Sequence, residues 1–317
     1  MFNHFTRLSI QRFTPLALGL LVLFSACSKK DNHGPNVATE NKDAEKDITS
    51  QLTAYADKDA IADHLLLARK DESTTRALAI HFPQLDREQA YQIQMALLAK
   101  MEAQGERLAG WKMGGTKIIK PGEELDPIFG FMLASDQIQS GSTLKSDQFA
   151  AGSPFVEAEV CFWLKQDLPG PKISPEELAA AIGGVGGASE LISARVRDAE
   201  GGSAAGVNLG IADGLSHGGF ILPEQQFPLN QVDFAKETSL VKINDKVQAE
   251  GAASIMMNGV PLDAVLALAN ELPKYDRYLR AGDVVIIGSM LESPPAVAGD
   301  HAQIIFSSFG TLDLTLE

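Results

Sequence analysis

The sequence predicts an α+β fold, in which a short helical segment precedes a larger domain of mixed or antiparallel strands. Residues 51–105 carry apolar side chains at helical spacing, whereas the chain after residue 110 consists of short β-branched and aromatic runs separated by glycine and proline. Only two helical stretches interrupt these runs, and a doubly wound sheet would need a helix between most of its strands. With 317 residues, of which 45% are hydrophobic, the chain can bury a large core.

The first residues have the pattern of a secretory signal peptide. A basic lead precedes an apolar run at residues 14–24, which is too short to span a membrane. The sequence Leu-Phe-Ser-Ala-Cys at residues 23–27 resembles the lipobox of bacterial lipoproteins, whose cysteine is acylated and becomes the new N-terminus. We therefore expect residues 1–27 to be a lipoprotein signal peptide with Cys27 as the lipidation site. The alternative is ordinary cleavage with an incidental cysteine.

A lipidated Cys27 would make the membrane a partner of the protein, because each buried methylene of an acyl chain contributes about 0.8 kcal/mol. Ser28 directly follows and resembles the pattern that sorts bacterial lipoproteins to the outer membrane. The expected location is therefore the cell envelope, lipid-anchored on the periplasmic face of the outer membrane. Residues 28–50 are polar and charged, and we expect them to form a tether.

Residues 51–105 are expected to form a small helical subdomain. An apolar stripe around Leu65 indicates one helix. A second helix is predicted to begin after Asp86, because Gln89 can complete a capping box there, and to end at Gly105.

Residues 106–317 are expected to form the β-rich domain. Two helices are predicted within it, one after Ser174, where Glu177 can complete a capping box, and one at residues 262–272. The candidate strands are rich in β-branched and aromatic residues and lie at residues 110–113, 129–133, 155–164, 182–185 running towards 192, 207–212, 219–222, 239–243, 284–287, 302–306 and 311–316.

Several function classes are not supported by the sequence. The net charge of −14 argues against a nucleic-acid binder, because neutralising phosphates requires clustered Lys and Arg. The glycines at residues 183–187 match neither a P-loop nor a dinucleotide fingerprint, and no Gly-x-Ser-x-Gly elbow occurs. His217 and His301 show no metal-ligand spacing, so we expect them at the surface and expect no zinc site. Cys161, mid-strand among apolar residues, is expected to be a small core residue.

The predicted strand at residues 155–164 carries two acids on one face. Because side chains alternate along a strand, Glu157 and Glu159 point the same way, about 6.5–7 Å apart. The same face also carries Cys161 and Trp163, which is unusual for a solvent-exposed face. Two carboxylates on a partly buried face are costly unless a cation or hydrogen-bond donors compensate. The pattern indicates a site for a hard metal ion; the alternative is a pair of acids salt-bridged to Lys or Arg.

Other segments stand out in the same half of the chain. Lys112 lies in Gly-Trp-Lys-Met-Gly, Asp126 opens Asp-Pro-Ile-Phe-Gly, and Glu190 follows Ser189 and precedes an Arg-Val-Arg-Asp run at residues 195–198. Together with the Val-Glu-Ala-Glu-Val strand, these segments follow one another along the chain in the same order as the motifs of a known family. In that order the chain, from about residue 60 to 317, resembles the 2-oxopent-4-enoate hydratase and 4-oxalocrotonate decarboxylase branch of the fumarylacetoacetate hydrolase superfamily.

The resemblance implies a mixed β-roll that assembles as a homo-oligomer and binds one divalent cation through Glu157, Glu159 and Glu190. The chemistry agrees, because three carboxylates without Cys or His select a hard ion such as Mg²⁺ or Mn²⁺. A small 2-oxo acid offers such an ion a carboxylate oxygen and the adjacent carbonyl oxygen. The ion then acts as a Lewis acid that stabilises an enolate.

The resemblance also assigns the remaining candidate residues. Lys112 is expected to be the catalytic residue, either moving protons with a pKa lowered by burial or binding the substrate carboxylate; the alternative is a packed stem with its ammonium in solvent. Asp126, Asp213 and Ser216 match substrate-binding loops of the family. The implied function is a divalent-metal-dependent lyase, a hydratase or decarboxylase of 2-oxo or 2-hydroxydienoic acids.

One departure from the family pattern leaves the substrate open. The family loop commonly reads Ala-Asp-Asn-Ala-Ser, whereas this chain has Ala-Asp-Gly-Leu-Ser at residues 212–216, so Gly214 lacks a side-chain amide. A lipoprotein signal is also unusual for cytosolic degraders of aromatic-ring fragments. Two alternatives therefore remain at this point: a non-catalytic envelope lipoprotein that binds a small acid or a protein, and C–C hydrolysis of an acylpyruvate.

Overall fold

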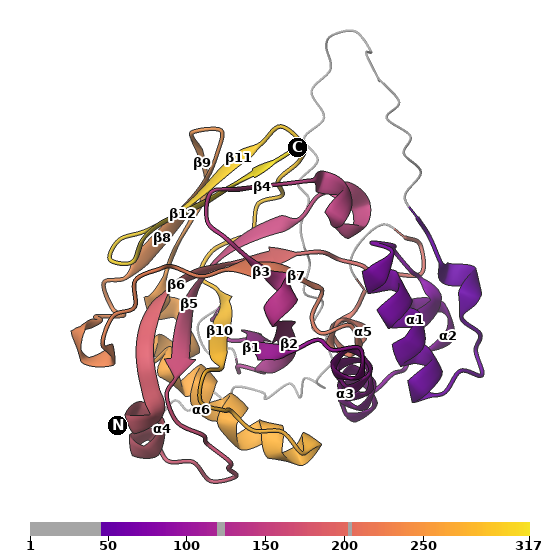
Figure 1. Cartoon of the computed structure of the whole chain (residues 1–317), viewed down its shortest axis with the longest axis horizontal. Helices are drawn as coiled ribbons and strands as arrows, with labels where there is room; N and C mark the ends of the chain where they lie inside the picture. The colour runs from indigo at the N-terminus through magenta and orange to yellow at the C-terminus, as the bar shows by residue number, and fades with distance from the viewer. Residues whose placement is uncertain (1–45, 119–123, 202–204) are drawn as a thin grey trace, which may run out of the picture. The chain divides into compact units, whose positions relative to one another are not determined.

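The structure is a computed structural model that describes residues 46–118, 124–201 and 205–317 (Figure 1). The predicted signal peptide, with Cys27, lies outside the described residues, and so does most of the predicted tether. At the start of the described part, Ile48 is buried and the backbone of Asp47 forms a β-bridge with that of Thr74. No helix among the described residues is long and apolar enough to cross a membrane.

Among the described residues three α-helices precede the first strand, and two of them, α1 and α3, pack against each other (Figure 1). α1 (Lys58–Lys70) begins at Asp57, whose carboxylate accepts hydrogen bonds from two amides of the first turn. α3 (Arg87–Ala103) begins with the predicted capping box between Asp86 and Gln89, which is confirmed. The short α2 (Ala77–His81) was not expected.

Seven strands form the sheet that carries the site residues, in the order β2-β1-β10-β5-β6-β7-β3. Its β1–β10 and β7–β3 pairs are parallel and the other pairs are antiparallel, so the predicted mixed α+β fold is confirmed. The sheet is curled, and β2 and β7 approach each other. The strands are β1 (Leu108–Gly114), β2 (Ile128–Leu133), β3 (Gln137–Ile138), β5 (Phe155–Leu164), β6 (Ile182–Ile192), β7 (His217–Ile221) and β10 (Val284–Ser289).

A second sheet of five strands, in the order β4-β12-β11-β8-β9, packs on β5 and β6. Its β8–β9 hairpin turns at Asn244 and Asp245, both with positive φ, as a two-residue primed turn requires. β9 was not predicted, because it is an edge strand without buried apolar residues, and four of its seven residues are exposed. The strands are β4 (Ser142–Leu144), β8 (Thr238–Ile243), β9 (Lys246–Ala252), β11 (His301–Phe306) and β12 (Gly310–Leu316).

Three α-helices lie within the described residues of the β-rich part. α4 (Pro175–Ala181) has the predicted capping box and α6 (Leu262–Glu271) lies where it was predicted. The strand predicted at residues 207–212 is wrong: these residues form α5 (Val207–Ala212), which packs against α3. A short apolar run does not distinguish a buried helix from a strand by periodicity. A tertiary contact also favours the helix, because Asn208 donates a hydrogen bond to the carbonyl of Leu85.

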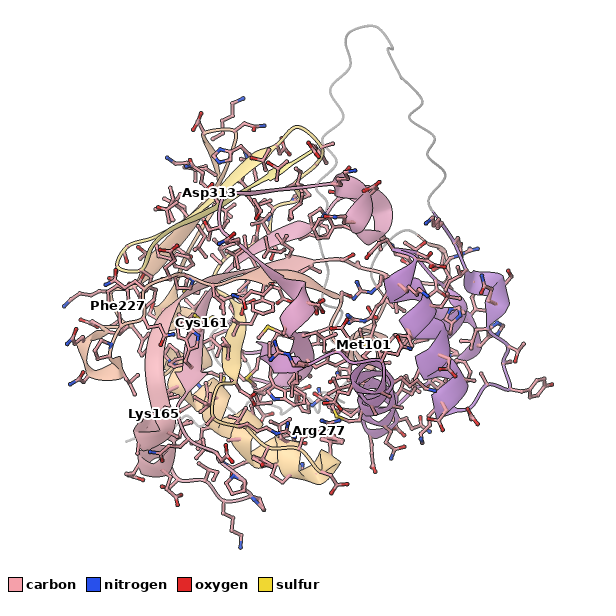
Figure 2. The ribbon with its side chains drawn as sticks, in the orientation of Figure 1. Met101, Cys161, Lys165, Phe227, Arg277 and Asp313 are labelled. Carbon is pink, nitrogen blue, oxygen red and sulfur yellow. The ribbon has the colours of Figure 1, made fainter. Side chains whose placement is uncertain are left out.

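The curled sheet has a small apolar core on the face that carries the acids. Cys161, labelled in Figure 2, belongs to it and is fully buried, which confirms the prediction that it is a core residue. Side-chain alternation puts it on the same face as Glu159, two residues earlier on β5. The members of this core are Met132, Cys161, Ala188, Phe220, Val284 and Ile286.

Gly187 of β6 allows the two sheets to pack closely against each other. A Cβ on Gly187 would lie 2.7 Å from the ring of Phe306, which belongs to the second sheet. Because Phe306 is buried, its ring has little room to move. The two sheets therefore approach closely where β6 carries no side chain.

We predict that Gly187→Ala destabilises the protein by about 1–3 kcal/mol, because overpacking displaces a buried ring. The measurement is the midpoint of urea unfolding. Gly210→Ala is the matched control: it lies in α5 with nothing within 4 Å of the added Cβ, so it should be neutral or slightly stabilising. Equal midpoints for both variants would contradict the close approach of the sheets.

Candidate metal centre

Glu157, Glu159 and Glu190 form one cluster, in which Glu159 and Glu190 are fully buried and Glu157 is half-buried. Glu157 on β5 lies directly opposite Glu190 on β6 in the strand register, and Glu159 follows on the same face of β5. One carboxylate oxygen from each lies within 4.8 Å of the other two. Among the described residues this is the only group of three or more His, Cys, Asp or Glu side chains with that geometry.

Each carboxylate is held by a donor from another part of the fold. The Ser293 hydroxyl donates to Glu157 Oε1 at 2.6 Å, and the Gly288 amide donates to Glu159 Oε2 at 2.6 Å. Glu190 Oε1 has two partners: the Lys112 ammonium at 2.7 Å and His217 Nδ1 at 2.8 Å. These contacts fix the three carboxylates in orientation.

Two carboxylate oxygens of the cluster have no partner. Glu159 Oε1 and Glu190 Oε2 are buried and make no hydrogen bond to any described residue. A buried acceptor without a partner costs about 1–3 kcal/mol, and more when it is charged. A cation bound between the carboxylates would satisfy both atoms, and an all-oxygen, all-carboxylate donor set suits a hard divalent ion. The residues present therefore fit Mg²⁺ or Mn²⁺.

The pKa values show how much negative charge the cluster concentrates. Burial, followed by the charge of Glu190, raises the pKa of Glu157 and raises that of Glu159 well above its ordinary value. Burial also acts to raise the pKa of Glu190, but the Lys112 ammonium and the His217 hydrogen bond outweigh it and lower that pKa. In the metal-free protein, Glu190 is thus the carboxylate that most readily stays ionised.

Lys112 lies on β1 and is almost fully buried. We expected burial to lower its pKa. Burial does act in that direction, but attraction to Glu190, Glu157 and Glu159 is larger, and the pKa of Lys112 is raised. The expectation of a lowered pKa is therefore wrong for the metal-free protein. The alternative of an ammonium in solvent is wrong too, since Nζ contacts Glu190 and donates to the carbonyl of Leu215 at 3.1 Å.

The loop before β7 presents that carbonyl. Gly214, Leu215 and Ser216 all have positive φ, between 57° and 68°. For non-glycine residues such a conformation costs about 1–3 kcal/mol each and persists only where the surroundings impose it. Here the Ser193 amide donates to the carbonyl of Ser216. The loop also packs so closely on β2 that a Cβ on Gly130 would lie 2.5 Å from the Gly214 carbonyl oxygen. Ser216 thus lies beside the residue that contacts Lys112.

Asp213 has different neighbours. Its carboxylate is fully buried between Arg69 of α1 and Arg195, with Nε to Oδ distances of 3.4 and 3.2 Å. Asp126 is exposed and forms an ion pair with Arg87 of α3. The structure thus brings Lys112 and the three glutamates together, but pairs Asp213 and Asp126 with arginines.

His217 was missed by sequence reasoning. We expected it at the surface, and that expectation is wrong: it is 1% exposed and hydrogen-bonded to Glu190. Its place directly after the Asp-Gly-Leu-Ser loop was the available signal. Arg69 was also missed, and no sequence signal links it to Asp213, which lies 144 residues further along the chain. His301, by contrast, is 42% exposed in its side chain.

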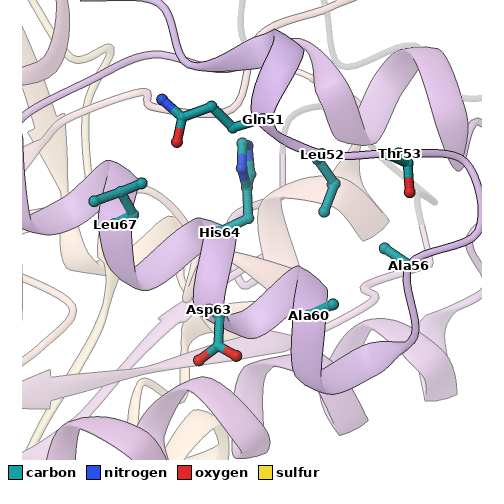
Figure 3. A pocket seen from close by; sticks show the side chains of 8 residues that line it. All are labelled: Gln51, Leu52, Thr53, Ala56, Ala60, Asp63, His64 and Leu67. Carbon is teal, nitrogen blue, oxygen red and sulfur yellow. The ribbon is translucent and has the colours of Figure 1, made fainter.

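Two cavities are not lined by any of the three glutamates. One, of about 310 Å³, is lined by Arg69, Asp136, Arg195 and His217 among others, so His217 stands between it and Glu190. The other, of about 360 Å³, lies between η1 (Thr49–Gln51) and α1 (Figure 3). Figure 3 shows that Gln51 and His64 are among its lining residues, and none of the three glutamates belongs to it.

Known proteins resemble this chain over most of its length, although no family model matches. The chain is 30% identical to 2-hydroxyhexa-2,4-dienoate hydratase of Comamonas testosteroni over 251 residues, which cover 78% of this chain and 92% of the relative. It is 29% identical to 2-oxo-hept-4-ene-1,7-dioate hydratase of Escherichia coli over 256 residues, or 80% of this chain and 95% of that enzyme.

The fold is similar to that of 4-oxalocrotonate decarboxylase from Pseudomonas putida G7. That enzyme complexed with magnesium and adipate superposes with a TM-score of 0.73 at 25% sequence identity, covering 82% of this chain and 97% of that chain. Its complex with calcium and acetate gives the same TM-score at 26% identity.

We predict that divalent cations stabilise the protein more strongly as pH rises. The folded pKa values of Glu157 and Glu159 lie above the ordinary 4.5. Above that pH the folded metal-free protein therefore binds more protons than the unfolded chain, and its stability falls as pH rises through the folded pKa values. A bound cation replaces those protons, and at 100 times its Kd it adds about 2.7 kcal/mol.

The measurement is the rise in Tm on adding Mg²⁺ or Mn²⁺, followed from about pH 5 to about pH 8, where it should grow. Glu159→Gln is the control, because the amide oxygen can still accept from Gly288 while the charge is lost. It should abolish most of the rise. A rise of the same size at every pH would contradict a proton-linked site.

Proposed function

This chain belongs to the hydratase and 4-oxalocrotonate decarboxylase branch of the fumarylacetoacetate hydrolase superfamily, and we propose that it is a divalent-metal-dependent lyase of small 2-oxo or 2-hydroxydienoic acids. The observation that carries the proposal is the cluster of three glutamates, two of them fully buried, with Lys112 bound to one of them. Relatives that match most of the chain are named as hydratases and decarboxylases of such acids.

Glu157, Glu159 and Glu190 are the proposed ligands of Mg²⁺ or Mn²⁺. The unpartnered Glu159 Oε1 and Glu190 Oε2 are the atoms best placed to bind the ion, since the other oxygen of each carboxylate already accepts from Gly288, or from Lys112 and His217. When bound, the ion supplies a Lewis acid for the carboxylate and carbonyl oxygens of a 2-oxo acid.

Lys112 is the proposed catalytic residue. An ammonium has three donors, and two of them reach Glu190 and the Leu215 carbonyl, which leaves one for the substrate. Because its pKa is raised, Lys112 is held as an ammonium in the metal-free protein. We propose that it binds the substrate carboxylate or gives a proton to the developing product.

The predicted substrate-binding residues differ in how they would act. Ser216 is proposed to contact substrate directly, since it follows Leu215, whose carbonyl binds Lys112. Asp213 is proposed to position the loop at residues 214–216 and not to touch substrate, because its carboxylate already pairs with the buried Arg69 and Arg195. A direct contact by Asp126 would require its ion pair with Arg87 to open.

The assay that tests the proposal follows 2-hydroxypenta-2,4-dienoate and 4-oxalocrotonate in the presence of Mg²⁺ or Mn²⁺, which also separates hydration from decarboxylation. Glu159→Ala and Lys112→Ala should each lower kcat/KM by about 100-fold or more, because each removes a charged group from the reacting centre. Glu224→Ala, at an exposed loop position, is the matched control and should be active. Full activity of Glu159→Ala would discard this site.

We also propose that the protein is a lipid-anchored homo-oligomer of the cell envelope, on the periplasmic face of the outer membrane. The support for the anchor is the lipobox-like sequence ending in Cys27, and the support for the assembly is the family resemblance.

We predict that Cys27→Ser releases the protein from the membrane fraction, because it removes the acylated thiol and with it the buried acyl chains. Fractionation of cells followed by detection of the protein is the measurement, with Cys161→Ser as the matched thiol control. Cys27→Ser protein that stays in the membrane fraction would show that lipid is not the anchor.

A further inference from the structure

His217 reaches Glu190 because of an irregularity in β7. Glu190 pairs with Phe220, so strict alternation back from Phe220 would place His217 on the opposite face of the sheet. The register shifts between Leu191 and Ile192, where β7 has one extra residue, and a bulge of this kind turns a side chain to the other face. Gly218 is that extra residue, and a Cβ on it would lie 2.7 Å from the Cβ of Ser193.

The ring of His217 is held firmly in place. Arg195 donates to the carbonyl of His217 at 2.6 Å, and Asp213 in turn holds Arg195. All three side chains are buried, and the ring lies 5.8 Å from that of Phe220. Nδ1 is 2.8 Å from Glu190 Oε1, and an ionised carboxylate only accepts, so Nδ1 carries the hydrogen of this bond.

The other side of the ring faces the 310 Å³ cavity. Nε2 makes no hydrogen bond to a described residue, and the nearest carboxylate, that of Asp136, lies 3.7 Å away. The cavity lining is polar, with Arg69, Glu72 and Asp136 among its members. The imidazole therefore separates Glu190 from a polar space that water can enter.

We infer that His217 is a positioning residue of the metal centre: Nδ1–H holds Glu190 so that the unpartnered Oε2 faces the ion, and the ring closes the wall between Glu190 and the polar cavity. The inference rests on the proposed function. Without the ring, Glu190 Oε1 would keep only the Lys112 contact, and the carboxylate could rotate towards the cavity. Outer partners that orient metal ligands typically change metal affinity by about 10–100-fold when removed.

The test measures Mn²⁺ affinity of the full chain by calorimetry and by the electron paramagnetic resonance signal of free Mn²⁺. His217→Ala should weaken Mn²⁺ binding about 10–100-fold. His217→Asn should restore it to within about 3-fold of the wild type, because an Asn amide nitrogen can stand where Nδ1 stands. His217→Gln carries its amide one bond too far and should behave like His217→Ala; it replaces that variant if the alanine protein does not fold.

His64→Ala is the matched control. His64 is also a buried histidine with one side-chain hydrogen bond, to Thr75 at 2.8 Å, but it lies on α1 away from the glutamates. It should lose stability without losing Mn²⁺ affinity. A role of His217 limited to folding would instead lower the Tm of the metal-free protein and leave the Mn²⁺ affinity of folded protein unchanged.

The outcomes separate this inference from the proposed function. Wild-type protein that binds no Mn²⁺ would overturn the metal centre itself, and this inference with it. If the wild type binds Mn²⁺ and both His217→Ala and His217→Gln bind it equally tightly, the inference alone is overturned. The same holds if His217→Asn binds Mn²⁺ as weakly as His217→Ala.

Discussion

The constraint on which the site depends is the repulsion among three carboxylates, two of them fully buried, that each place one oxygen within 4.8 Å of the others. Taking such charges out of water is costly, and only an opposite charge or directed donors offset the cost. Lys112 supplies one charge, and His217, Ser293 and Gly288 supply donors, yet two buried oxygens still lack a partner. The cluster is therefore incomplete without protons or a cation, which ties its chemistry to the charge of a bound ion.

The fold places these compensating groups on separate elements around one curled sheet. β5 and β6 pair so that Glu157 faces Glu190, β1 brings Lys112 across, and the loop before β7 supplies the Leu215 carbonyl. Strands thus carry all four charged side chains, and the strained loop adds one carbonyl that accepts from the lysine. This arrangement suits a metal-dependent lyase, because the ion needs ligands held in a fixed geometry.

Features set by residues close together in the sequence were predicted correctly, whereas features set by contacts between distant segments were not. The faces of β5 and the capping boxes at Asp86 and Ser174 follow from neighbours within four residues, and they were predicted. The helix at Val207–Ala212 was mistaken for a strand, because its six residues fit both patterns and packing on α3 decides. His217 was placed at the surface, because no local pattern reveals a bulge that depends on register with β6.

The sequence by itself determined the residue types and the local geometry: carboxylates at alternate positions of one strand, a lysine between glycines, and a hard-ion donor set. The fold class and the family resemblance followed from these patterns in order along the chain. Only the tertiary structure decided that Lys112 binds Glu190, that arginines surround Asp213, and that His217 completes the cluster. The physical reason is that burial and pairing of charges are set by contacts between distant segments, such as Arg69 and Asp213, which are 144 residues apart, and local periodicity does not encode such contacts.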